Sequence, residues 1–268
     1  MKASQLPSGK FVKLIFLGDS GTGKTGALVS LIKAGYKIKM LDTDNGVPVL
    51  LNYIKHECPD KIDNLDVEVI QDIVTSVQGA GEGKVIPTFA NQKKAFSECL
   101  SLMNKWSDQS TPSEWGEDTV FVLDSLTRLG DYAYNWCQGM NPSAKEPRTW
   151  FYSAQQAVEM FLAKITSDEF KAHVIVITHV NYKEMKDGTQ KGWPTAIGSA
   201  LGPTIPTYFN NMVLAETVGF GANAKRKIQT FPTGTIDLKT AAPFAFDNSA
   251  LDLGSGLATI FSKLLTGK

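Results

Sequence analysis

Cysteine is scarce in this sequence of 268 residues, which contains only Cys58, Cys99 and Cys137. Their odd number and wide separation exclude a disulfide framework, and no two of them have the short spacing of zinc ligands. Cysteine usage of this kind is typical of proteins in a reducing compartment. The sequence therefore predicts a cytoplasmic protein.

Long apolar runs and a net charge are also missing. No apolar stretch approaches the roughly 18 residues that a membrane span requires, and residues 1–10 are polar, without the apolar core of a signal peptide. Basic and acidic residues number 27 each. The chain as a whole is therefore not a polyanion-binding protein, and any nucleic-acid contact requires a local patch or many subunits acting together. No membrane partner is expected.

The most informative motif lies at 18–25 and fits the pattern G-x-x-x-x-G-K-T of a phosphate-binding P-loop. Residues 11–17 before it form an apolar run of strand length, and residues 27–33 after it have the pattern of a helix. Glycines let backbone N–H groups approach phosphate oxygens closely. Lys24 is predicted to reach the β- and γ-phosphates, and the Thr25 hydroxyl to bind Mg²⁺. The predicted nucleotide-binding residues are Gly18, Asp19, Ser20, Gly21, Thr22, Gly23, Lys24 and Thr25.

Strands and helices are predicted to alternate along the rest of the chain. Near-continuous apolar strands of this kind indicate an α/β fold with a mostly parallel central sheet flanked by helices. Three shorter strands near the C-terminus predict an antiparallel extension of the sheet. We expect a flexible N-terminus at 1–10 and one domain at 11–268. The predicted strands are 37–44, 67–70, 119–125, 172–179, 211–216, 225–230 and 235–239, and the predicted helices are 49–56, 91–106, 126–138, 150–165 and 255–265.

Carboxylates end two of the predicted strands. Asp124 follows four apolar residues, and a carboxylate at the carboxyl end of a buried strand faces the ligand crevice of an open sheet. We predict that Asp124 positions the metal, although an Asp there also suits the N-cap of the next helix. Asp42 or Asp44 could accept a proton from water. Alternatively, these two cap backbone N–H groups around Asn45 and Gly46.

A histidine ends the last buried strand. His179 is predicted to lie beside the γ-phosphate and to report on it through a hydrogen bond, passing the signal into the segment that follows. The alternative is a strand-end histidine that bonds the backbone.

Four elements, taken in order, resemble RecA-like recombinase ATPases: the P-loop, Leu-Asp-Thr-Asp at 41–44, Val-Phe-Val-Leu-Asp-Ser at 120–125 and Val-Ile-Thr-His at 176–179. The chain also resembles phage-encoded RecA-core ATPases implicated in single-strand annealing and recombination. The resemblance covers most of the chain, from about residue 11 to about residue 246. It implies a DNA-stimulated ATPase that uses ATP and Mg²⁺ and acts on single-stranded DNA.

The same resemblance implies partners and a location. Identical subunits would form a ring or filament with ATP at their interfaces, and a single-strand-binding protein would be a further partner. If the chain is phage-encoded, the location is the cytoplasm of a bacterial host.

The resemblance also implies roles for single residues. Asp44 matches the acidic residue that activates water, where glutamate is commoner, and His179 matches a polar sensor that is usually glutamine. Lys239 lies where related proteins place a lysine finger that reaches the ATP of the neighbouring subunit. Arg226 is the rival candidate for that finger, and a solvated lysine is the alternative for Lys239.

Two segments correspond to the loops that line the DNA channel in the recombinase fold. Basic residues interleaved with aromatic residues suit single strands, because cations meet phosphates and rings stack on bases. Alternatively, 182–191 is a β-hairpin with Asp187-Gly188 at its centre, and a hairpin in the channel satisfies both interpretations. The segment 139–149 contributes Lys145 and Arg148, and the segment 181–203 contributes Tyr182, Lys183, Lys186, Lys191 and Trp193.

A second function class stays open at this point. An ATP-dependent switch or assembly factor that grips a protein partner, without binding DNA, would carry the same P-loop and carboxylates. The neutral net charge favours this alternative mildly.

Overall fold

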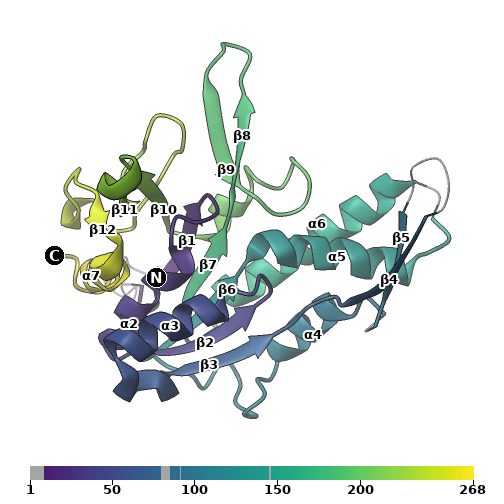
Figure 1. Cartoon of the computed structure of the whole chain (residues 1–268), viewed down its shortest axis with the longest axis horizontal. Helices are drawn as coiled ribbons and strands as arrows, with labels where there is room; N and C mark the ends of the chain where they lie inside the picture. The colour runs from purple at the N-terminus through teal and green to yellow at the C-terminus, as the bar shows by residue number, and fades with distance from the viewer. Residues whose placement is uncertain (1–8, 80–84, 91, 145) are drawn as a thin grey trace, which may run out of the picture.

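An eight-stranded sheet forms the centre of the computed structural model, which describes residues 9–79, 85–90, 92–144 and 146–268. Residues 1–8, which make up most of the predicted flexible N-terminus, lie outside the described part. In chain order the strands are β1 (Lys13–Gly18), β2 (Lys37–Asp42), β3 (Leu65–Val69), β6 (Thr119–Asp124), β7 (His173–Thr178), β10 (Asn211–Val218), β11 (Lys225–Gln229) and β12 (Leu251–Asp252). Across the sheet their order is β12-β11-β10-β1-β7-β6-β2-β3 (Figure 1).

Six neighbouring strands, from β10 to β3, run parallel, and β11 and β12 add an antiparallel edge. The inner parallel strands β1, β6 and β7 are buried on both faces. In β1, Ile15 and Leu17 belong to one apolar core, whereas Leu14 and Phe16 belong to the other. This alternation explains why the strand is continuously apolar in the sequence. The predicted α/β fold, with a mostly parallel sheet and an antiparallel C-terminal extension, is confirmed.

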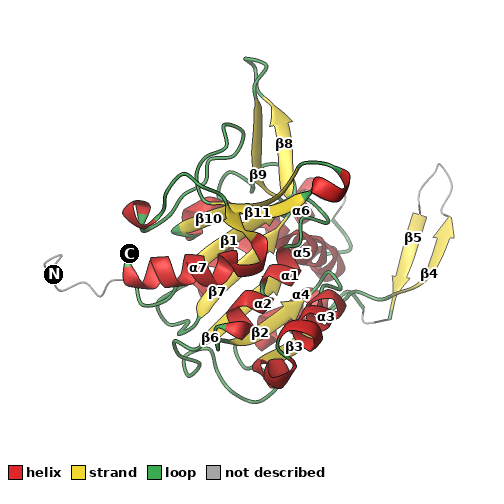
Figure 2. Ribbon diagram, turned by 60° about the vertical axis from the view of Figure 1, so that its left-hand side comes forward, coloured by secondary structure: helices red, strands yellow, loops and turns green. Residues whose placement is uncertain are grey.

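Helices cover both faces of the sheet (Figure 2). On one face lie α4 (Ala95–Leu102), α5 (Leu126–Met140) and α6 (Pro147–Thr166), whose apolar residues join the core of Ile15. On the other face lie α1 (Lys24–Ala27), α2 (Val29–Lys33), α3 (Val47–Glu57) and α7 (Leu253–Thr266), which share the core of Leu14. Short 3₁₀ turns occur at Pro59–Asn64, Ile205–Tyr208, Gly221–Asn223 and Pro243–Ala245.

Helix α5 approaches the chain after β7 unusually closely. A Cβ atom added to Gly130 would lie 3.0 Å from the carbonyl carbon of Ala196 and 3.0 Å from the nitrogen of Ile197. A Cβ atom at this distance is tighter than nearly all real contacts, so the backbone at 196–197 would have to shift by a few tenths of an ångström. The Ser125 hydroxyl accepts a hydrogen bond from the Arg128 N–H (3.4 Å) and so caps the start of the helix.

Two antiparallel hairpins project from the body of the molecule (Figures 1 and 2). One consists of β4 (Val74–Gly79) and β5 (Val85–Phe89), and the other of β8 (Val180–Glu184) and β9 (Gln190–Pro194). In both views β8–β9 lies at the top and β4–β5 at the right-hand side. The second hairpin confirms the expected turn around Asp187-Gly188, where Gly188 has a φ of 79°. No pattern in 65–90 had predicted the first.

Some predicted elements differ from the structure. Residues 235–239 do not form a strand, because Lys239 makes only an isolated bridge to Met212. The third strand of the extension is β12, which pairs with β11. The expected helix at 91–106 is shorter, and α5 and α6 leave only residues 141–146 between them. None of the helices that the structure describes is long and apolar enough to cross a bilayer.

Candidate active site

The P-loop connects β1 to α1 and closes around its own lysine. Lys24 is only 8% exposed, and its Nζ donates hydrogen bonds to the carbonyl oxygens of Gly18 (2.7 Å) and Asp19 (2.9 Å). Burial lowers the pKa of Lys24, and the nearby carboxylates of Asp124, Asp19 and Asp44 oppose this effect. The ammonium group therefore lies in the loop that the sequence predicted, ready to exchange carbonyl partners for phosphate oxygens.

Glycine is required at Gly23 for two reasons. Its φ of 90° is in the left-handed region, and an added Cβ would lie 2.6 Å from Cδ2 of Leu253 and 3.1 Å from Cδ of Arg226. These contacts bring α7 and β11 against the P-loop. They place Arg226 beside the P-loop of its own chain.

Thr25 and Asp124 come together as a metal-binding pair requires. The Thr25 hydroxyl donates a hydrogen bond of 2.6 Å to Oδ2 of Asp124, which is 4% exposed. Burial raises the pKa of Asp124 to about 6, the Thr25 hydrogen bond opposes this, and Asp42 and Asp44 add to it. Burial makes the charged form of Asp124 unfavourable, and a bound cation would offset that cost. Among the described residues no group of three His, Cys, Asp or Glu side chains could hold a metal, and Mg²⁺ in such sites takes its other ligands from phosphates and water.

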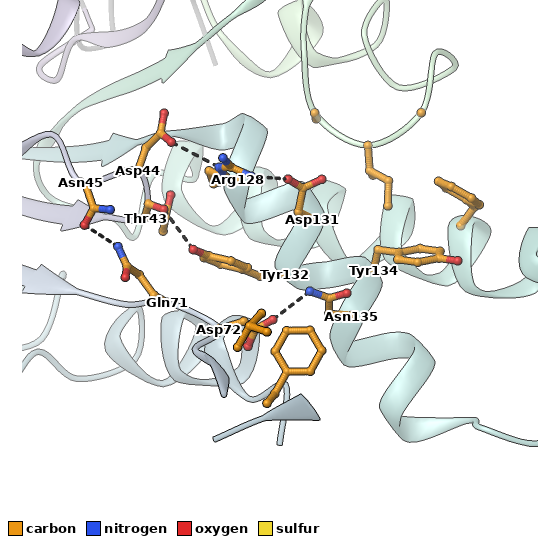
Figure 3. Close-up of a pocket in the computed structure, with 16 residues that line it drawn as sticks. Thr43, Asp44, Asn45, Gln71, Asp72, Arg128, Asp131, Tyr132, Tyr134 and Asn135 are labelled. Carbon is orange, nitrogen blue, oxygen red and sulfur yellow. Dashed lines mark hydrogen bonds and ion pairs between the residues drawn. The ribbon is translucent and has the colours of Figure 1, made fainter. Parts of the chain in front are cut away.

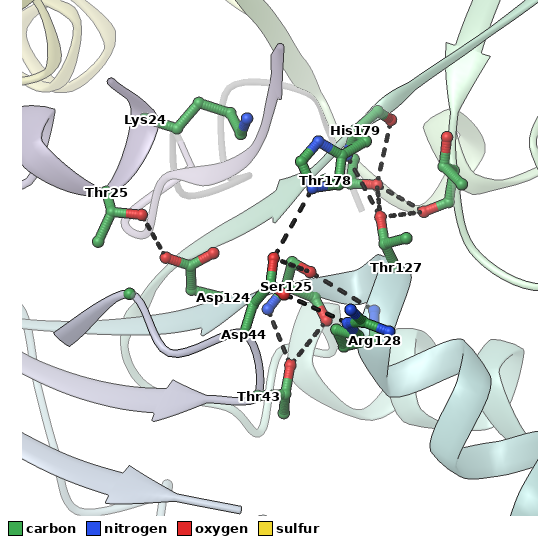
Figure 4. Close-up of polar contacts among 12 residues, drawn as sticks. Lys24, Thr25, Thr43, Asp44, Asp124, Ser125, Thr127, Arg128, Thr178 and His179 are labelled. Atoms are coloured by element: carbon green, nitrogen blue, oxygen red, sulfur yellow. Dashed lines mark hydrogen bonds and ion pairs between the residues drawn. The ribbon is translucent and has the colours of Figure 1, made fainter. Parts of the chain in front are cut away.

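The two carboxylates that end β2 have different surroundings. Asp42 is 1% exposed and accepts hydrogen bonds from the N–H groups of Asp44 (3.0 Å), Gly46 (3.1 Å) and Val47 (3.0 Å). It therefore fixes the turn before α3. Asp44 instead points toward the end of β7, where one carboxylate oxygen lies 3.7 Å from Nε2 of His179 (Figure 4). Of the two, Asp44 is the one placed to act on water.

Ser125, which caps α5, and Arg128 within α5 both contact the Asp44 carboxylate. The Ser125 hydroxyl donates to Oδ2 (3.4 Å), and Nε of Arg128 donates to Oδ1 (3.3 Å). Arg128 also contacts Asp131 through a second nitrogen, at 3.4 Å. Sequence reasoning missed Arg128. Its position three residues after Ser125 puts both side chains on one face of the helix and is the signal that could have found it.

One cavity of about 290 Å³ joins these side chains. Its lining includes the P-loop glycines, Lys24, Thr25, Asp44, Asp124 and His179. The residues come from the ends of β1, β2, β6 and β7, which meet at the carboxyl edge of the sheet. The P-loop, the buried acid with its hydroxyl, and the two polar strand ends together fit a nucleoside triphosphate with Mg²⁺.

The sequence itself matches a family model for AAA domains over residues 10–240. This chain belongs to the AAA domain family AAA_24. The match covers the P-loop and every strand of the parallel sheet. The matched part of this chain is therefore a nucleotide-binding ATPase domain of the P-loop type. No curated protein sequence matches the chain.

Solved structures with a similar arrangement are distant in sequence. The RadB recombinase aligns with 16% identity and a TM-score of 0.44, over 81% of this chain and 79% of its own. A KaiC-like protein from Pyrococcus horikoshii aligns with 11% identity and a TM-score of 0.41, over 81% and 78%. The flagellar accessory protein FlaH from Methanocaldococcus jannaschii aligns with 13% identity and a TM-score of 0.37, over 81% and 76%.

A second cavity continues from the P-loop of this AAA domain. It has a volume of about 630 Å³ and shares Gly21, Gly26, Tyr53 and Arg226 with the first. A Cβ atom on Gly26 would lie 2.7 Å from the Tyr53 ring, so that glycine lets the ring pack on the loop. Tyr53 and Arg226 offer planar groups on which a nucleobase can stack.

The structure does not bring Lys239 to this site. Its Nζ donates a hydrogen bond of 2.6 Å to the carbonyl oxygen of Pro206, and burial lowers its pKa. Lys239 does not line either cavity beside the P-loop. A role for it requires a second subunit and stays a prediction.

The residues predicted to contact DNA fall into two separate groups. Tyr182, Lys183 and Lys186 are exposed on the β8–β9 hairpin. Further along it, Lys191 pairs with Asp237, and Trp193 is half-buried. The other group lies at the start of α6, where Arg148 is exposed, and its Lys145 is outside the described residues.

Proposed function

We propose that this AAA domain hydrolyses ATP as a RecA-like protein acting on single-stranded DNA, in recombination or strand annealing. One observation carries the proposal: Lys24, the Thr25–Asp124 pair, Asp44 and His179 line the same cavity. A P-loop alone accounts for binding. Hydrolysis also requires a group that activates water and a group that senses the phosphate, and Asp44 and His179 are the candidates for these roles.

Each side chain has a distinct part in this proposal. Bound ATP and Mg²⁺ supply the phosphoryl group and the charge that stabilises its transfer. Lys24 gives up its carbonyl contacts to bind phosphate oxygens, while Thr25 and Asp124 hold the metal. Asp44 would orient a water molecule and accept its proton. His179 would sense the γ-phosphate through a hydrogen bond and pass its state to the β8–β9 hairpin. That hairpin follows β7 directly, because β8 starts at Val180.

The test measures ATP turnover with and without single-stranded DNA, at low and at high salt. Stimulation by DNA that weakens with salt is expected, because phosphate contacts release counterions. Lys24→Ala serves as the control for contaminating ATPases and should abolish turnover. Turnover that ignores DNA at both salt concentrations, together with no salt-sensitive DNA binding, would refute the DNA part of the proposal.

We also propose that ATP is shared between subunits of a ring or filament. Arg226 already packs on its own P-loop, which favours Lys239 as the finger that reaches a neighbour. Lys239→Ala subunits retain an intact phosphate site, and Asp124→Ala subunits retain an intact finger. Mixing the two inactive variants should restore part of the turnover. If the mixture stays inactive while both variants assemble, Lys239 does not act across subunits.

A specific observation supports the second function class. The segment leading into the β4–β5 hairpin and the hairpin itself expose Ile73, Val74 and Val77, at 57%, 49% and 62%. Several exposed apolar side chains on one projecting hairpin are typical of a surface that contacts another protein. An ATP-dependent switch that grips a protein partner would use this hairpin, and its turnover would respond to that partner instead of DNA.

A further inference from the structure

A cavity larger than the P-loop cavity, which we name the α5 cavity, has Asp44 among its lining residues (Figure 3). Its volume is about 610 Å³. Its walls come from the turn after β2, the segment after β3, helix α5, the start of α6 and residues 196–198. Asp44 lines both this cavity and the P-loop cavity. The carboxylate proposed to act on water is therefore the shared wall of two compartments.

One wall of the α5 cavity is aromatic. The rings of Tyr134 on α5 and Phe151 on α6 lie 4.6 Å apart between centroids and are tilted by 39°. Phe151 is 40% exposed, and Phe89 at the end of β5 lines the same space. Partly exposed rings on facing helices are a surface on which a flat heterocycle stacks, because each added ring removes apolar area from water.

The floor of the cavity is acidic and hydrogen-bonding. Asn135 Nδ2 donates a hydrogen bond of 3.0 Å to Asp72, and Arg128 contacts both Asp44 and Asp131. Three carboxylates against one guanidinium repel a phosphate group. Carboxylates and amides do accept and donate to the edges of nucleobases, as a carboxylate accepts from the amino group of cytosine. The floor therefore suits a base and excludes the backbone that carries it.

A cation lies against Phe89, one of the aromatic residues that line the cavity. Lys93 lies with Nζ 5.2 Å from the centroid of the Phe89 ring and donates a hydrogen bond to Gln138 of α5. Lys94 beside it and Arg148 at the start of α6 are exposed. A cation beside the aromatic wall and carboxylates at the floor match a nucleotide whose phosphates stay outside while its base points inward.

We propose that the α5 cavity binds an unstacked base of single-stranded DNA, with the flanking phosphates on Lys93, Lys94 and Arg148. The proposal rests on the proposed DNA-dependent function and adds the site at which a base is held. It also gives Arg128 a positioning role. A base that hydrogen-bonds on the floor competes for the guanidinium that Asp44 and Asp131 share, and so changes how Asp44 is held.

The experiment compares two strands of equal length, one with normal nucleotides and one with abasic sites, which keeps every phosphate. Affinity is measured by fluorescence anisotropy in the presence of a non-hydrolysable ATP analogue. Wild type should bind the abasic strand more weakly by roughly 5- to 150-fold, the range that loss of one stacked base produces. Phe151→Ala and Phe151→Leu should lose affinity for the normal strand and discriminate less between the two.

Tyr152→Ala is the matched control, because Tyr152 is 64% exposed on the same helix and does not line the cavity. It should bind both strands like wild type. Nucleotide affinity reports whether each variant is folded. Equal wild-type affinity for both strands, or equal losses in the Phe151 and Tyr152 variants, overturns the base site and leaves the DNA-dependent function intact. If wild type binds neither strand, both proposals fail.

Arg128 is tested by a readout that simple misfolding does not produce. In Arg128→Lys, which keeps the charge but not the planar fork, DNA affinity should persist while the ratio of DNA-stimulated to basal turnover falls. A variant in which kcat falls equally with and without DNA would show that Arg128 does not link the α5 cavity to Asp44.

Discussion

Replacing Asp124 by asparagine should make the ligand-free protein more stable while it abolishes the metal site. Asp124 is 4% exposed, and burial raises its pKa from 3.8 to about 6. That difference corresponds to about 3 kcal/mol between the charged and neutral forms. Because the folded state holds the proton more tightly than the unfolded state, the ionised carboxylate destabilises the fold above about pH 6, and acidification toward pH 4 removes this cost.

The expected gain for Asp124→Asn is therefore about 2 to 3 kcal/mol in the free energy of unfolding at pH 8, declining toward zero at about pH 4. The amide oxygen can still accept the Thr25 hydrogen bond, so the Thr25 hydroxyl keeps its acceptor. Urea denaturation at several pH values, with a chelator and without nucleotide, measures the effect. Asp63→Asn, at an exposed position, is the control.

Two results would refute this reasoning. One is a gain in the free energy of unfolding that is the same at pH 5 and pH 8, because such a gain would not depend on the ionisation of Asp124. The other is a loss of stability at pH 8, which would mean that the Asp124 carboxylate is stabilised by its surroundings. A confirmed gain, with loss of Mg²⁺-dependent turnover, would show that the site is maintained at the expense of stability.

Three further changes test other parts of the molecule. Gly130→Ala should destabilise the fold by about 1 to 3 kcal/mol, because its new methyl meets the Ala196 backbone at 3.0 Å, whereas Gly139→Ala on the same helix should be neutral or stabilising by up to about 1 kcal/mol. Equal thermal midpoints for the two variants would contradict this. Lys24→Ala should lower turnover by at least about 100-fold while the melting curve stays cooperative, and residual turnover near the wild-type rate would exclude the P-loop assignment. His179→Ala should reduce the stimulation of turnover by DNA more than the basal rate, and a parallel fall in both would argue against a sensor.

The sheet could be predicted from the sequence because strands that are buried on both faces appear in it as continuous apolar runs. Strands such as β1 and β6 each have four consecutive apolar residues, 14–17 and 120–123, and they end where a glycine loop or a carboxylate begins. Since the carboxyl ends of parallel strands meet at one edge, Lys24, Asp124 and His179 could be placed near one another without coordinates. The hairpin around Asp187-Gly188 could also be proposed from the sequence, because an Asp-Gly pair favours a tight turn whatever the rest of the fold.

Other features have no recognisable pattern in the sequence. The two-residue strand β12 is too short to have a period. Residues 235–239 alternate in polarity like a strand, although among them only Lys239 forms a β-bridge. The residue pattern alone did not separate Asp42 from Asp44, and only the resemblance to RecA-like ATPases favoured Asp44, since the turn geometry decides which one bonds backbone N–H groups. Arg128 resembles any exposed helical arginine until the end of β2 is placed beside it.

Helix α5 has a mechanical property that follows from its contact at Gly130. The close approach to Ala196 lies about 6 Å along the helix axis from Leu126 and about 15 Å from Met140, at 1.5 Å per residue. If the helix tilts as a rigid rod about this contact, a displacement of the far end is reduced to about two fifths and reversed at the near end. A shift of about 2 Å beside Lys93 thus becomes about 0.8 Å beside Asp44, comparable to the difference between a hydrogen bond and a broken one.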